Sequence, residues 1–146
     1  MFKIVEYKQE YQGDMILCYL SAKDALRETL HLHEDLFDIQ KNYFNKNDMF
    51  WIAINDKNRV IGMIGTNTVS EIDMWLKRLF IKPEMKRKGV ATALLNIVIN
   101  YAKSKGITSV HARFNDNYVE ASEFYSAKGF IESELSDGLR HFILKV

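Results

Sequence analysis

The sequence predicts an α/β protein in which a mixed sheet is covered by helices on both faces. Three observations predict this class. The 146 residues fit one compact domain. Stretches with apolar residues at alternate positions, typical of strands, are interleaved with stretches spaced by three and four, typical of helices. One long amphipathic helix lies between two strands, a unit that makes those strands parallel. We therefore expect the order β, α, α, β, β, β, α, β, α, β, β in a single domain over residues 1–146.

The first part of the chain is predicted to hold one strand and two helices. Residues 2–7 alternate between apolar and polar side chains, which favours a strand. Between Tyr11 and Phe44 apolar residues recur at steps of three and four, with a break near Ser21 to Asp24. This spacing predicts two helices with poorly defined ends.

A hairpin and a third strand are predicted next. Residues 50–54 and 60–64 are rich in strand formers and flank the polar turn cluster 55–59. A further strand over 72–81 ends before Pro83, the one proline of the chain, because proline has no amide hydrogen to continue a ladder.

The last part of the chain predicts a crossover unit followed by a helix and two strands. Apolar residues lie on one face of residues 88–105, and Gly106 stands where a left-handed C-terminal residue belongs. A strand over 107–114 completes the unit. Asn117 and Glu120 have the spacing of an N-cap pair that opens a helix ending at Gly129. Residues 130–135 and 140–145 then form the closing strands.

Composition excludes several classes of protein. Hydrophobic residues make up 47% of the chain and charged residues 27%, unlike a disordered tail, a collagen-like rod or a disulfide scaffold. A formal charge of +1 gives no strong overall field toward nucleic acid or anionic lipid. The lone Cys18 cannot form an internal disulfide, which favours a reducing, cytoplasmic compartment. We expect no membrane span and no signal peptide, because no apolar run has the required length.

Basic residues gather between residues 77 and 88, where the single acid is Glu84. They are Lys77, Arg78, Lys82, Lys86, Arg87 and Lys88. Such a run is usually a solvated loop. Here it ends at Gly89, after a strand and at the start of the long helix, where free amides and the positive end of the helix dipole lie. Gly89 and the small Ala91 leave room for close approach, so the pattern predicts a phosphate cradle.

Two common phosphate motifs are absent from the sequence. No Walker loop occurs, since no pair of glycines flanks four residues before Lys-Ser/Thr. Gly62 and Gly65 lie in the expected hairpin and not at a helix start, so they do not form a dinucleotide fingerprint.

The segment Leu79–Ala91, LFIKPEMKRKGVA, resembles the acetyl-CoA motif of the Gcn5-related N-acetyltransferase (GNAT) family, Arg/Gln-x-x-Gly-x-Gly/Ala. Lys86, Gly89 and Ala91 fill the three marked positions, with Lys86 in place of Arg or Gln. The segment from Asn117 to Phe130 resembles the family's later signature: an Asn, an Ala, a Tyr four residues after that Ala, and a closing Gly-Phe. Asn117 stands one residue before the usual Asn position, which is Tyr118 here.

The resemblance implies a GNAT-like acyltransferase fold and an enzyme that transfers the acetyl group of acetyl-CoA directly to a primary amine of a small molecule or peptide. It implies cofactor contacts from the loop and helix start, from the strand edge before them and from Asn117. These residues are Leu79, Phe80, Ile81, Lys86, Arg87, Lys88, Gly89, Val90, Ala91, Thr92 and Asn117. Lys82 would add positive electrostatic potential, and a backbone amide near Ile81 would bind the carbonyl oxygen of the acetyl group.

The resemblance also implies that Tyr125 is the general acid that protonates the departing thiolate, although an aromatic residue at helical spacing is otherwise a core residue. A base is needed because an amine of pKa about 10 is mostly protonated at neutral pH. Several family members carry a Glu at the position of Trp75, which cannot act as a base. Asp73, on the same face of the strand, and His111, on the next parallel strand, are the alternatives, although the pattern by itself favours a surface carboxylate and a packed histidine.

The remaining interpretations concern ligands and partners. His31, His33, Glu34 and Asp35 form a polar cluster where the family often binds its acceptor, and also read as a solvated helix face. A metal site on His31 and His33 is not expected, because a spacing of two places them on different helix faces. A non-catalytic acyl-CoA sensor is the main rival to the enzyme, and Trp75 favours it. Nucleic-acid binding is disfavoured because no aromatic residues interleave with the basic run, and homodimerisation stays open.

Overall fold

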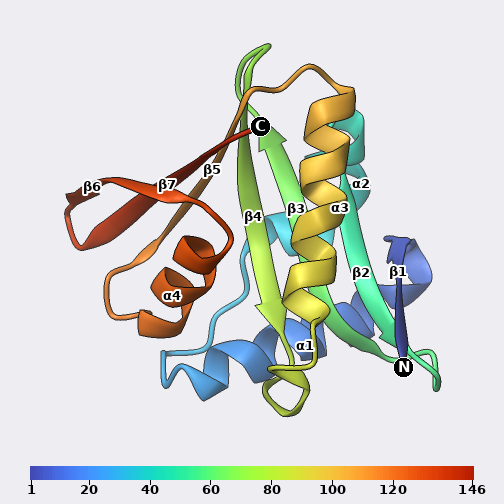
Figure 1. The fold of residues 1–146 in the computed structure, drawn as a ribbon. Coiled ribbons are helices and arrows are strands. Elements are labelled where there is room, and N and C mark those ends of the chain that lie inside the picture. The colour runs from blue at the N-terminus through green and yellow to red at the C-terminus, as the bar shows by residue number, and fades with distance from the viewer. The chain divides into compact units, whose positions relative to one another are not determined.

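The computed structural model describes residues 1–146 and contains seven strands and four α-helices (Figure 1). The strands are β1 (Phe2–Glu6), β2 (Phe50–Asn55), β3 (Val60–Thr68), β4 (Asp73–Ile81), β5 (Ser109–Asn115), β6 (Ile131–Ser136) and β7 (Leu139–Lys145). The helices are α1 (Gln12–Ala25), α2 (Ile39–Asn42), α3 (Val90–Ser104) and α4 (Val119–Ala127). The predicted order of strands and helices is confirmed. The strands form one mixed sheet in the order β1-β2-β3-β4-β5-β7-β6.

The chain divides into two compact units, which are described separately. The first comprises Met1–Asn67 and Lys77–Val98, and the second comprises Thr68–Leu76 and Ile99–Val146. Strand β4 contributes its first residues to the second unit and its last residues to the first. Whether residues 1–146 behave as a single domain stays a prediction.

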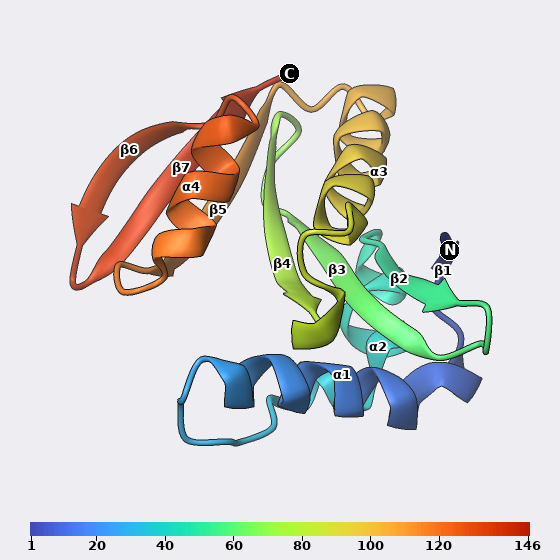
Figure 2. The same ribbon diagram turned by 60° about the horizontal axis from the view of Figure 1, so that its bottom comes forward.

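In the first unit the sheet has a helix on each face (Figures 1 and 2). Strand β2 pairs antiparallel with both β1 and β3, as the predicted hairpin requires. Met63 belongs to a buried cluster with Met15 and Tyr19 of α1, so this face of β3 packs on α1. The neighbouring Gly62 points the other way: a Cβ there would come within 2.9 Å of the Val90 side chain of α3. Gly62 therefore permits α3 to lie close against β3.

The segment between α1 and β2 is less helical than predicted. Helix α1 continues to Ala25, past the expected break near residues 21–24. The second predicted helix is reduced to the single turn α2 between 3₁₀ turns at Glu34–Phe37 and Phe44–Lys46. Leu30, Leu32 and Phe37, which supplied the helical spacing, are exposed or nearly so. The two predicted helices are present, but the second is a single turn, because Leu36 and Ile39 are buried whereas the other three residues are not.

The second unit combines the start of β4 with β5, β7, β6 and α4. Asp73, Met74 and Trp75 pair in parallel with residues 109–111 of β5, which confirms the predicted parallel crossover. Strand β7 pairs antiparallel with β5 and β6. Helix α4 covers one face through Tyr125, whose ring contacts Phe114 of β5 and lies near Phe142 of β7.

The start of α4 differs from the prediction. Tyr118 is the N-cap residue, and no side chain caps the helix. Asn117 instead donates its backbone amide to Oδ1 of Asn115, at 2.9 Å, within the turn that precedes the helix. The predicted Asn117–Glu120 cap pair was therefore wrong, because the local Asx turn takes Asn117 out of the cap position. The end of α4 before Gly129 is confirmed, with φ of 92° at that glycine.

Candidate active site

The loop between β4 and α3 has an unusual backbone. After the 3₁₀ turn Pro83–Met85, Lys86 is extended, and then Arg87 and Gly89 both adopt left-handed conformations, with φ of 63° and 83°. Left-handed residues beside right-handed ones turn successive amides toward one concave side, a geometry that binds anions. A Cβ on Gly89 would meet nothing within 4 Å, so the space beside this residue is open.

The hydrogen-bond ladder of α3 begins immediately after this loop. Ala93 donates its amide to the carbonyl of Gly89 at 3.0 Å. The amides of residues 90–92 precede that bond and belong to the first turn, where a helix has no internal acceptors for them. The open glycine, the first-turn amides and the dipole of this 15-residue helix together fit a diphosphate group.

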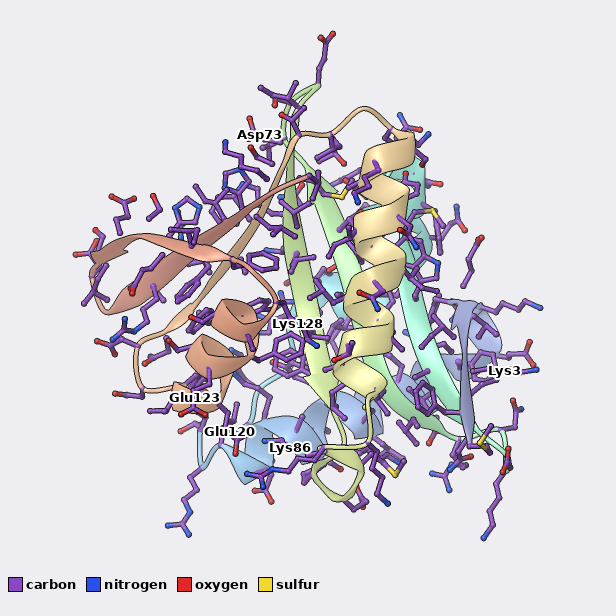
Figure 3. The ribbon with its side chains drawn as sticks, in the orientation of Figure 1. Lys3, Asp73, Lys86, Glu120, Glu123 and Lys128 are labelled. Atoms are coloured by element: carbon purple, nitrogen blue, oxygen red, sulfur yellow. The ribbon has the colours of Figure 1, made fainter.

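The basic residues of the loop do not all serve one patch. Lys86, Arg87 and Lys88 are exposed around the start of α3, and Figure 3 shows Lys86 on this loop. Arg78 is separate from them. Its guanidinium forms a two-pronged ion pair with Asp35, with Nη2 to Oδ1 at 2.8 Å and Nε to Oδ2 at 3.1 Å. One of the six charges of the basic run is therefore used inside the first unit.

Asp35 also accepts a hydrogen bond of 2.7 Å from the hydroxyl of Tyr43. Burial alone would raise the pKa of Asp35, but the hydrogen bonds from Arg78 and Tyr43 outweigh it and lower the pKa. Burial, followed by the hydrogen bond to Asp35, raises the pKa of Tyr43. Carboxylate, guanidinium and neutral phenol thus form one satisfied network.

Tyr125 lies in an aromatic cluster of the second unit. Its ring stacks on Phe114 at 5.5 Å between centroids and meets Phe124 and Phe130 edge-on. Only 7% of the residue is exposed. Burial raises the pKa of its phenol above the ordinary value, so the hydroxyl keeps its proton at neutral pH.

Asp73 and His111, predicted separately, are in direct contact. Oδ1 of Asp73 lies 2.8 Å from Nε2 of His111. On its other side, Nδ1 of His111 lies 2.8 Å from Nε2 of His141 on β7, a residue that the sequence did not single out. Because a carboxylate only accepts, the Nε2–H of His111 donates to Asp73. In the neutral pair, Nδ1 of His111 then accepts from Nε2–H of His141.

Trp75 covers this chain of side chains. Its ring stacks on His111 at 4.8 Å and on His141 at 4.9 Å, and the guanidinium of Arg113 lies 4.7 Å from its centre. Burial, then the charges of His111 and Arg113, lowers the pKa of His141. Hydrogen bonds from His111 and Ser70 lower the pKa of Asp73. We call Asp73, His111, His141 and Trp75 the histidine cluster.

His31 and His33 do not lie on a helix. The segment has no regular secondary structure before Glu34, and the two rings meet edge-on at 4.6 Å. The helical-face argument against joint ligation was therefore wrong, because the segment is not helical. Of the polar residues predicted to gather here, Asp35 is bound to Arg78, and burial lowers the pKa of His33.

Sequence reasoning found Asp73 and His111 but missed His141 and the pair Asp35–Arg78. His141 reaches His111 because β7 lies beside β5 with Arg113 opposite His141. That register is not encoded in any local pattern. Arg78 was predicted only as one member of the basic run, because the sequence shows its charge but not its backbone conformation.

The chain matches the model of the acetyltransferase (GNAT) family over residues 15–130. It is 30% identical over 102 residues to human N-acetyltransferase 8, covering 66% of this chain and 44% of that protein. The chain spans about half the length of the curated relatives it matches.

Solved structures agree with this match. The GNAT-family acetyltransferase from Staphylococcus aureus Mu50 superimposes with a TM-score of 0.92 at 26% identity, covering 99% of both chains. The PaiA N-acetyltransferase from Thermoplasma acidophilum, solved with coenzyme A, gives a TM-score of 0.84 at 19% identity, covering 100% of this chain and 99% of that one. The predicted fold is confirmed. The chain belongs to the acetyltransferase (GNAT) family.

Proposed function

We propose that this protein is an acetyl-CoA-dependent N-acetyltransferase that transfers acetyl directly to a primary amine of a small molecule or peptide. The observation that carries the proposal is the loop before α3, where left-handed Arg87 and Gly89 lead into a helix start with free first-turn amides. Family membership makes acetyl-CoA the expected co-substrate.

The cofactor contacts remain those that the resemblance implied. The amides of residues 87–92 would bind the diphosphate, and Lys82, Lys86 and Lys88 would add positive potential. The strand edge at Leu79, Phe80 and Ile81 would pair with amides of the pantetheine arm. Asn117 keeps its predicted contact as a proposal, and its backbone is already fixed by the turn at Asn115.

Direct transfer is supported by the state of the chain's only thiol. Cys18 is fully buried in the first unit, and burial raises its pKa to about 12. A thiol in this state supplies no thiolate to carry the acetyl group, so a covalent cysteine intermediate is disfavoured. In the proposed step the amine nitrogen bonds to the thioester carbon and the carbon–sulfur bond breaks.

Tyr125 would give its proton to the departing thiolate. Its buried phenol is neutral at physiological pH, as a general acid must be before the reaction. The histidine cluster would take the proton that the amine loses. Because His111 and His141 share one hydrogen bond between ring nitrogens, the pair accepts one proton on either ring without breaking that bond. Asp73 fixes the tautomer of His111 by accepting a hydrogen bond from its Nε2–H.

Calorimetry with acetyl-CoA, followed by thioester consumption, tests the proposal. The amine panel contains polyamines, aminoglycosides, amino acids and peptides with free N-termini. Binding without turnover on any amine would favour the rival function, an acyl-CoA sensor, which Trp75 in place of a carboxylate keeps open. No binding at about 1 mM acetyl-CoA would end both ideas.

Tyr125→Phe tests the acid separately. We expect turnover to fall about 100-fold while acetyl-CoA affinity stays within about twofold, since the hydroxyl acts only in the transition state. Tyr11→Phe, which removes a surface hydroxyl bonded to Asn58, is the matched control and keeps full turnover. Unchanged turnover in Tyr125→Phe would remove this residue from the mechanism.

The expectations about cellular location and binding partners stay proposals. Cys18 is free, in keeping with a cytoplasmic location. None of the helices has the length and apolar character needed to span a bilayer. Association with nucleic acid, with a membrane surface or with a second copy of the chain is tested by the retention volume of the purified protein with and without each partner.

A further inference from the structure

Arg78 has a conformation that its neighbours in the sheet lack. Six residues other than glycine have positive φ, and five of them lie in turns or loops. Arg78, with φ of 56°, is the one inside a β-strand, three residues before the end of β4. A long side chain pays a steric penalty in this conformation, which persists only where the surroundings enforce it.

The surroundings of Arg78 do enforce it. Asp35 holds the guanidinium in a two-pronged ion pair, and both side chains are mostly shielded, with 20% and 24% exposed. Asp35 is itself fixed by the hydroxyl of Tyr43. Tyr43 is 3% exposed, and its ring packs edge-on against Phe50 at 4.9 Å between centroids. These contacts connect the core of the first unit, through Tyr43 and Asp35, to the backbone of Arg78 in β4.

A left-handed residue within a strand interrupts the ladder and redirects the adjacent peptide groups. The peptide groups that follow Arg78 are those of Leu79, Phe80 and Ile81, the strand edge proposed to receive the acetyl-pantetheine arm. We propose that Asp35 and Tyr43 clamp Arg78 in its left-handed conformation and thereby aim the amides of this edge at the thioester. Asp35, Tyr43 and Arg78 are positioning residues, and the inference rests on the proposed function.

The same unit contains a matched ion pair that lacks this role. Arg59 binds Asp14 in the same two-pronged way, with Nη2 to Oδ1 at 2.7 Å and Nε to Oδ2 at 3.1 Å. The φ of Arg59 is not positive, and the pair joins α1 to the first residues of β3. Asp14→Ala therefore removes a two-pronged ion pair, together with the hydrogen bond from the amide of Val60, without releasing a left-handed strand residue.

The test compares Asp35→Ala, Arg78→Gly, the double variant Asp35→Ala/Arg78→Gly and the control Asp14→Ala. Asp35→Ala should lower kcat about 10- to 100-fold, because a small misplacement of reacting groups has an effect of that size, while the Kd of acetyl-CoA stays within about threefold. Glycine adopts positive φ without penalty, so Arg78→Gly in the Asp35→Ala background should restore kcat at least about fivefold. Asp14→Ala should keep kcat within about twofold of the unaltered protein.

Hydrogen exchange provides a readout that does not depend on activity. The amides of residues 79–81 should exchange at least about tenfold faster in Asp35→Ala than in the unaltered protein, and at unchanged rates in Asp14→Ala. Thermal unfolding of all four variants confirms that each is folded at the assay temperature.

Two results would overturn the clamp. One is a double variant that is as slow as Asp35→Ala or slower, which is the pattern of a plain loss of stability. The other is unchanged exchange of residues 79–81 in Asp35→Ala. If the unaltered protein binds acetyl-CoA but acetylates no amine, the proposed function fails instead, and the exchange experiment still decides whether the clamp exists.

Discussion

The loop before α3 and the histidine cluster differ in the chemical groups that they present: backbone amides in the loop and side chains in the cluster. In the loop the proposed binding groups are backbone amides, and the conformations of Arg87 and Gly89 decide where they point. In the histidine cluster the proposed proton-accepting groups are side chains from three strands, held by hydrogen bonds of 2.8 Å and by stacking on Trp75.

This difference determines which changes each region tolerates. The exposed side chains of the loop would contribute only positive potential to the proposed phosphate site, so the removal of one of them should matter little. A backbone change there should matter greatly. In the histidine cluster even a nearly isosteric replacement removes a donor or acceptor from a continuous chain. The following experiments test this contrast.

The largest effect is expected for Gly89→Ala compared with Gly106→Ala. Both glycines are left-handed, with φ of 83° and 79°, and a Cβ on either would meet nothing within 4 Å. Each variant should therefore lose about 1–2 kcal/mol of folding free energy from the strained conformation. Only Gly89→Ala should also weaken acetyl-CoA binding, by about 100-fold, because its backbone must approach the ligand. Equal affinities in calorimetry would contradict a backbone-built site.

An intermediate effect is expected in the histidine cluster as the pH changes. The folded state lowers the pKa of His141 below the ordinary 6.5, so the unfolded chain binds more protons near that pH. Stability should therefore fall as the pH drops through about 6.5 and below. His141→Gln should lessen this fall, and urea unfolding at pH 7.5 and 5.5 measures it. An identical pH dependence in the variant would show that His141 is not the responsible group.

The smallest effect is expected for the exposed Lys88. Lys88→Ala should weaken acetyl-CoA binding about threefold at low salt, and the difference should vanish near 1 M salt because of screening. Lys57→Ala, in the exposed turn between β2 and β3, is the control and should change nothing. If Lys88→Ala weakened acetyl-CoA binding as much as Gly89→Ala does, the proposed contrast between backbone and side-chain contributions would be wrong.

The same contrast explains how much the sequence could predict. Strand and helix order, the parallel crossover and the loop at Gly89 were predictable, because periodicity, Pro83 and glycine spacing are local signals. The contact between His111 and His141 was not, since it depends on a strand register set by the whole sheet. The short length of the second helix was not predictable, because Leu30, Leu32 and Phe37 are spaced as on a helix but are exposed.

Arg78 shows a third kind of limit. As an arginine it belongs to a basic run, yet the role proposed for it rests on one dihedral angle and on one partner 43 residues earlier. Neither is visible in composition or spacing. Asp35 likewise read as one acid among several polar neighbours, and only the ion pair separates it from them.

Gly62 acts as a spacer beneath the candidate site. The methyl group of an alanine there would come within 2.9 Å of the side chains of Ile81 and Val90 and 3.1 Å of Leu94, which belong to the end of β4 and the first turns of α3. Those two segments also carry the residues proposed to hold the co-substrate. The spacing of these two segments is thus set partly by the hydrogen atom on Gly62, and a substitution there would alter this spacing without changing any residue proposed to hold the co-substrate.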